Sequence, residues 1–126
     1  MPSRDEILSI FNSRLIDFLR ECTCVFPGDV MFSTYPMLAE ATIAADPAAI
    51  VTVLAQRVFG PYGDRIDARD EAFFLEDDTV VANEEPAVRM VIGTLRGKWS
   101  ELDLDARASM WAWLAQLKKI AAKVAV

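Results

Sequence analysis

The stretch DLDARASMWAWLAQLKKIAAKV, residues 103–124, is the clearest structural signal in this chain. Aspartates stand at its start and lysines near its end, which is the charge arrangement that a helix dipole favours. Its apolar residues recur every three or four positions, at Met110, Leu114, Leu117, Ala121 and Val124. The stretch therefore predicts a long helix with a broad apolar surface, which lies at the centre of a bundle or against a partner.

The N-terminal region predicts a second long helix. It opens with Ser3 and Glu6, a pair that can satisfy the free amides of a helix start. Apolar residues then recur at helical spacing as far as Cys22, and the proline and glycine at 27–28 form a turn that ends the helix.

Two further helices are expected from the positions of prolines. We place one from about Thr34 to Ala45, with Pro36 in its first turn and Ser33 or Thr34 as its cap. Asp46 is likewise a good cap, and Pro47 suits the first helical position, so the next helix is expected to start there and run to about residue 59. The sequence GPYGD, residues 60–64, is expected to break it.

The rest of the chain predicts two shorter helices, at about 70–76 and 86–97. TVVA, residues 79–82, is interpreted as a loop or helical turn, because a lone strand would have no partner. The expected fold is all-α: one domain over 1–126, with five or six helices in a single bundle. The predicted core consists of Phe11, Leu15, Phe18, Ile50, Leu54, Phe74, Leu95, Leu114 and Leu117.

Composition narrows the classes of function. Apolar residues make up 53% of the chain, which is typical of a globular protein, but no apolar run approaches the roughly 20 residues of a membrane span. The N-terminus lacks the features of a secretion signal, so we expect a cytoplasmic protein. A net charge of −6 argues against general nucleic-acid binding, although the basic tail could form such a face if the last two helices align.

The cysteines at 22 and 24 are the first candidates for chemistry. Structural zinc needs four ligands, and a chain with two cysteines and no histidine can supply them only by pooling thiols across a dimer. Residues two apart on a helix point about 200° away from each other, so Cys22 and Cys24 cannot form a disulfide there. Cys22 continues the apolar stripe and is expected in the core. We therefore predict no metal and no cofactor.

No other pattern predicts catalysis. Histidine is absent, and the acidic stretch DRIDARDE, residues 64–71, has apolar residues where a calcium loop needs oxygen ligands and glycine. An enzyme would need carboxylates brought together from distant segments, such as Asp70 or Glu71 meeting Glu40. We expect a non-enzymatic protein without catalytic residues.

Three tryptophans are the best remaining signal of function. Trp99, Trp111 and Trp113 lie close together in sequence, and tryptophan is enriched at protein interfaces. A small core hardly accommodates all three, so we expect Trp111 or Trp113 to face a protein partner. The leading hypothesis is an interaction module that binds through an apolar face near the last helix.

Self-association is the alternative. Residues 64–85 carry a net charge of −7 and residues 86–126 a net charge of +4, which could support head-to-tail assembly of a structural protein. Salt should weaken such an assembly, because exposed charges are screened within about 10 Å at 0.1 M.

Three segments of the chain share a pattern of aromatic and acidic residues on predicted helices: FNSRLIDFLRECTCVFPGD (11–29), RDEAFFL (69–75) and KWSELDLDARASMWAWLAQLKKIA (98–121). In these segments the chain resembles short helical proteins encoded by large DNA viruses of algae and protists. The resemblance implies a small, soluble, mostly helical protein without an established activity, located in the host cytoplasm or in the virion. It provides no active-site residues, and the CxC motif inside the first segment is a departure from the pattern.

Overall fold

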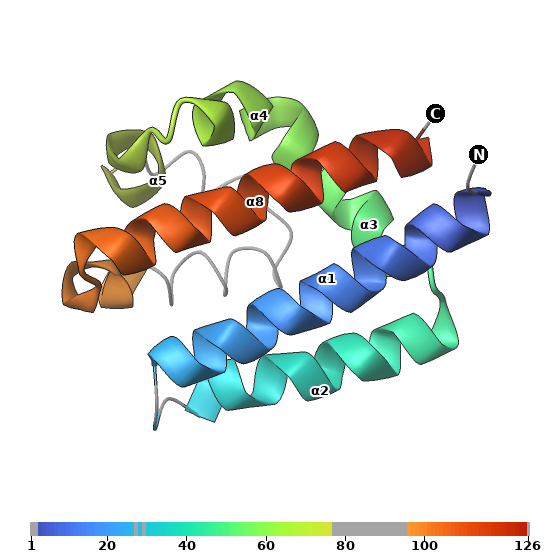
Figure 1. Ribbon diagram of the computed structural model, residues 1–126, viewed down its shortest axis with the longest axis horizontal. Coiled ribbons are helices and arrows are strands. Elements are labelled where there is room, and N and C mark those ends of the chain that lie inside the picture. Colours follow the sequence, from blue (N-terminus) through green and yellow to red (C-terminus); the bar gives the residue numbers. More distant parts are fainter. Residues whose placement is uncertain (1–2, 27, 29, 77–95, 126) are drawn as a thin grey trace.

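The computed structural model describes residues 3–26, 28, 30–76 and 96–125. Every regular element in these ranges is helical, with no strand among them, so the predicted all-α class is confirmed. Figure 1 shows α2, α1 and α8 side by side, with α1 in the middle and running opposite to both neighbours. The α4 and α5 helices lie beyond α8, on the side away from α2.

The first helix, α1 (Arg4–Val25), confirms the predicted start and end. The Ser3 hydroxyl accepts a hydrogen bond from the Glu6 amide at 3.2 Å, and the Phe26 amide donates to the Cys22 carbonyl at 2.9 Å. One side of α1 packs against α8 and an adjoining side against α2, which is why its buried stripe is broad.

The second helix, α2 (Val30–Ala45), begins earlier than predicted. Pro36 lies inside it, and the hydroxyls of Ser33 and Thr34 donate to the Val30 carbonyl at 2.9 and 2.8 Å, so neither residue is the cap. The proline removes one backbone hydrogen bond, and burial of Tyr35 and other α2 residues against the bundle offsets that loss.

The predicted break at residues 60–64 is wrong. Helix α3 (Ala49–Leu54) continues through a π-helical turn, η1 (Ala55–Phe59), into α4 (Gly60–Asp67). In the π-turn the Gly60 amide donates to the Ala55 carbonyl five residues back, and Pro61 falls in the first turn of α4, where its missing amide is tolerated. The shift in hydrogen bonding lets the proline follow a helix without stopping it.

This turn requires glycine at position 60, and we expect Gly60→Ala to lower the free energy of unfolding by about 1–3 kcal/mol. A Cβ there would stand 2.9 Å from the Ala55 carbonyl oxygen, which the backbone holds in place. Gly63→Ala is the matched control, because its Cβ would meet only the flexible end of Lys118. Urea unfolding of both variants measures the difference, and equal losses would contradict the role of the π-turn.

The remaining predicted helices follow. In α5 (Glu71–Glu76), Asp70 caps the start by accepting from the Phe73 amide at 3.1 Å, which confirms the helix predicted at 70–76. A 3₁₀ turn, η2 (Trp99–Glu101), precedes α8 (Leu104–Ala125), which starts where the aspartates predicted. Asp103 also caps this start, because its carboxylate accepts a hydrogen bond from the Ala106 amide at 2.8 Å. Residues 79–82 and nearly all of the predicted helix at 86–97 lie outside the described residues.

One cluster of buried side chains joins α1, α8 and the helices behind them. Of the predicted core, Phe11, Leu15, Phe18 and Leu117 are buried. Four others are half-buried and pack against the cluster, namely Ile50, Leu54, Phe74 and Leu114, while Leu95 lies outside the described residues. Helix α8 therefore lies at the centre of the described bundle.

Candidate interaction surface

Two of the three tryptophans predicted to bind a partner are buried in the core. Trp99 is 9% exposed and Trp111 is 6% exposed. Their rings meet edge to face with centroids 5.8 Å apart, and Trp111 also contacts Phe74 at 5.7 Å. Because α8 is central, this part of its apolar surface is covered by the protein's own helices and 3₁₀ turn.

The third tryptophan, Trp113, is half-buried. Its ring packs against Phe18 with centroids 5.9 Å apart, and its indole N–H donates a hydrogen bond to the Glu21 carboxylate. It lines a shallow hollow of about 580 Å³ on α8, together with Ser109, Ala112, Ala115, Gln116 and Lys119. Partner binding through Trp113 stays a prediction, and this hollow is where it would occur.

The two cysteines have different environments and are both free thiols. Cys22 is 1% exposed and lies 3.9 Å from the Met110 sulfur, which confirms its predicted place in the core. Burial raises the pKa of the Cys22 thiol to about 12, and the negative charge of Glu21 adds to this shift. Cys24 is exposed on the solvent side of α1.

The carboxylates proposed as an enzyme pair lie apart. Glu40, on α2, pairs with Arg20 at 2.8 Å, and Asp70, before α5, pairs with Arg65 at 2.7 Å. Hydrogen bonds from Arg65 and the Phe73 amide hold the pKa of Asp70 below its usual value. Among the described residues, no group of three or more acidic or cysteine side chains could hold a metal ion.

Among the described residues, most of the exposed large apolar side chains lie on α2, a helix that the sequence did not single out as a binding surface. This helix packs against α1 and α3, and its opposite side faces solvent. Val30 is 74% exposed, Met37 69% and Leu38 54%. Three exposed alanines complete this surface, which we call the α2 face: Val30, Met37, Leu38, Ala41, Ala44 and Ala45. The signal that could have found it is composition, because Glu40 is the helix's one charged residue.

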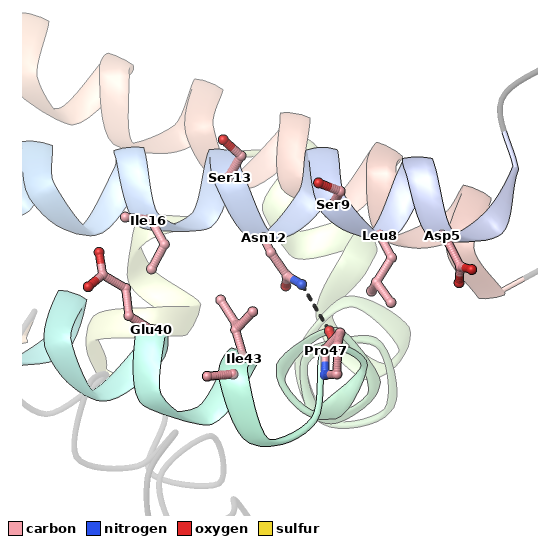
Figure 2. Close-up of a pocket in the computed structure, with 10 residues that line it drawn as sticks. Asp5, Leu8, Ser9, Asn12, Ser13, Ile16, Glu40, Ile43 and Pro47 are labelled. Carbon is pink, nitrogen blue, oxygen red and sulfur yellow. Dashed lines mark hydrogen bonds between the residues drawn. The ribbon is translucent and has the colours of Figure 1, made fainter.

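An open groove of about 740 Å³ runs beside the α2 face, between α1 and α2. We call it the α1–α2 groove; it is lined by residues 5, 8, 9, 12, 13 and 16 of α1 and by residues 40, 43, 44 and 47. Figure 2 shows Asp5 and Glu40 at its opposite ends, with Asn12 between them. The Asn12 amide nitrogen donates to the Pro47 carbonyl at 2.9 Å, so this side chain ties α1 to the connection between α2 and α3.

No single helix within the described ranges has the length and hydropathy to cross a membrane. Residues 33–45 and 49–67 reach that length and composition only as a pair, which is bent by 107°.

No protein-family model, curated protein sequence or solved structure matches this chain. The resemblance to viral helical proteins therefore stays a prediction from the sequence.

Proposed function

We propose that this protein is a non-enzymatic interaction module that docks a protein partner on the α2 face. One observation carries the proposal: a helix with a single charged residue leaves three large apolar side chains in solvent. A helix that is apolar on all sides is normally buried, and exposed apolar surface of this kind is typical of interaction sites.

The chemistry of the α2 face favours a protein over other partners. It has no basic residue to meet a phosphate backbone, and its apolar residues share one side of a regular helix. Full burial of a side chain such as Met37 or Leu38 stabilises a complex by about 1.5–3 kcal/mol relative to leaving it in water. Two such residues at the middle of the helix suit a partner with an apolar helix or groove.

Charge placed on the α2 face should abolish partner binding without unfolding the protein. We expect Met37→Glu and Leu38→Glu each to reduce recovery of the partner by at least about tenfold, because a carboxylate would be buried in the interface. Affinity capture from an extract of the source cells, with the wild-type protein as bait, identifies the partner and measures its recovery. Leu104→Glu is the matched control, since Leu104 is 79% exposed and lies at the start of α8.

Partner capture and light scattering distinguish the α2 face from two alternatives, which are binding at the hollow on α8 and self-assembly. Loss of the partner with Trp113→Ala but not with Met37→Glu would move the site to the hollow on α8 and contradict the α2 face. Light scattering on purified protein tests self-assembly. A discrete oligomer that Leu38→Glu converts to monomer would show that the α2 face binds the α2 face of a second copy. Such an oligomer would replace the proposed partner with a second copy of this chain.

A further inference from the structure

The α1–α2 groove differs from the α2 face because a buried polar group lies on its floor. Asn12 is only 7% exposed, and while its amide nitrogen donates to the Pro47 carbonyl, its Oδ1 atom is buried and accepts no hydrogen bond. A buried acceptor without a donor destabilises the folded state. A partner that supplies a donor would remove that cost, and the groove around Asn12 is open to solvent.

The charges that line the groove favour a positively charged partner. Its lining includes two carboxylates, on Asp5 and Glu40, and no lysine or arginine. Glu40 is already paired with Arg20, whereas Asp5 makes no ion pair among the described residues. The protein as a whole carries a net charge of −6. Positive charge on the partner would therefore be favoured at the Asp5 end, both by the local carboxylate and by the field of the protein.

The size of the groove suits a helix. From Asp5 to Ile16 the α1 wall spans eleven residue steps, or about 17 Å at 1.5 Å per residue, which is about three helical turns. Apolar side chains line both walls, with Leu8 and Ile16 on α1 and Ile43 on α2. Leu8 and Ile16 are only 6% and 9% exposed, so a helix lying in this seam would bury further apolar surface mainly at Ile43 and at Ala44, which also belongs to the α2 face.

We propose that the α1–α2 groove binds a basic amphipathic helix of the partner protein. Apolar residues of that helix pack on the groove walls, a side-chain N–H donates to Asn12 Oδ1, and a lysine or arginine faces Asp5. Because Oδ1 is itself buried, binding requires neighbouring side chains of the groove to change rotamer. This inference rests on the proposed function and names the chemical class of the partner.

Two synthetic peptides test this selection directly. Each is about four helical turns long and carries the same leucine stripe, with lysine at all other positions in one and glutamate in the other. Fluorescence anisotropy at physiological salt measures binding, and amide NMR spectra locate it. We expect the lysine peptide to bind at least about tenfold more tightly and to shift the resonances of Ser9, Asn12, Ser13 and Ile43.

Variants of the groove separate specific binding from general attraction to an acidic protein. Asp5→Asn should weaken the lysine peptide about two- to fivefold, which corresponds to one exposed charge pair. Asp64→Asn is the matched control, because it removes an exposed acid from α4, on the side of α8 away from α2. Asn12→Leu should weaken binding about fivefold, the effect of one lost hydrogen bond.

Asn12 has a structural role as well, and the test distinguishes it. If Asn12 only ties α1 to the connection after α2, Asn12→Leu would change the thermal melting temperature and leave the affinity for the lysine peptide unchanged, which would overturn the assignment. Should Asn12→Leu fail to fold, the affinities of Asp5→Asn and Asp64→Asn for the lysine peptide decide whether binding is specific to the groove. Equal weakening by those two variants, or equal binding of the lysine and glutamate peptides, would also overturn it.

The inference and the proposed function can fail separately. Suppose that Met37→Glu abolishes partner capture but the lysine peptide does not shift the groove resonances. That result would support the proposed function and reject the basic helix as the ligand of the groove. Groove binding of the lysine peptide, combined with partner capture that survives Met37→Glu and Leu38→Glu, would reject the α2 face as the docking surface.

Discussion

Replacing Trp111 by alanine is expected to lower the free energy of unfolding by about 3–5 kcal/mol. The indole is 6% exposed and contacts the rings of both Trp99 and Phe74, so its removal leaves a cavity that these large rings cannot fill. Domains of this size are stable by about 5–15 kcal/mol, so the variant should be close to unfolding at room temperature. Urea unfolding followed by circular dichroism measures the loss.

Trp113→Ala is the internal comparison for this prediction. Trp113 lies two positions away on the same helix but is half-buried, with one ring contact to Phe18 and one hydrogen bond to Glu21. We expect it to lose about half as much stability as Trp111→Ala. A Trp111→Ala variant within about 1 kcal/mol of the wild type would contradict the burial of this residue. Loss of partner binding in Trp111→Ala would follow from unfolding, so Trp113 is the residue that tests the α8 hollow.

The elements predicted best are those whose signals are local. Ser3, Asp70 and Asp103 each accept a hydrogen bond from an amide three residues later, so the sequence alone contains both the donor and the acceptor. The apolar period of α1 and α8 is likewise a property of one segment. The starts of three helices could therefore be predicted from the chain.

The two errors in the fold come from prolines. At Pro36 the local rule predicts a helix start, but the helix begins six residues earlier, at Val30. Around Pro61 it predicts a break, but the helical path continues through the proline into α4. Packing of α2 residues against the bundle offsets the hydrogen bond lost at Pro36, and a π-turn accommodates Pro61. Neither solution depends on neighbours in sequence alone, so neither could be predicted from local patterns.

The candidate surface was harder to predict than the fold because periodicity does not say which apolar face is covered. The stripe around Trp111 is buried by the helices that pack on α8, whereas Met37 and Leu38 stay in solvent because α2 lies at the edge of the bundle. Asn12 shows the same limit, since its partner is the carbonyl of Pro47, 35 residues later. Only the three-dimensional arrangement identifies its unpaired oxygen.

The stability of the protein should fall steeply at alkaline pH because of Cys22. Burial raises the pKa of this thiol from its ordinary value of 9.0 to about 12 in the folded state. Below pH 9 the thiol is protonated in both states and its contribution to stability is fully present. Between pH 9 and 12 the unfolded chain releases the proton and the folded chain keeps it, so stability is lost as the pH rises.

The slope of this loss is at most about 1.4 kcal/mol per pH unit, and urea unfolding at pH 9, 10 and 11 measures it. Cys22→Ala removes the group, so its stability should depend less on pH than that of the wild type, even though the variant starts lower because it loses packing against Met110. Cys24→Ala is the control, because Cys24 is exposed and its removal should leave the wild-type slope. Ionisation of tyrosines and lysines is common to all three proteins and cancels in the comparison. Parallel curves for wild type and Cys22→Ala would show that the buried thiol does not control the alkaline transition.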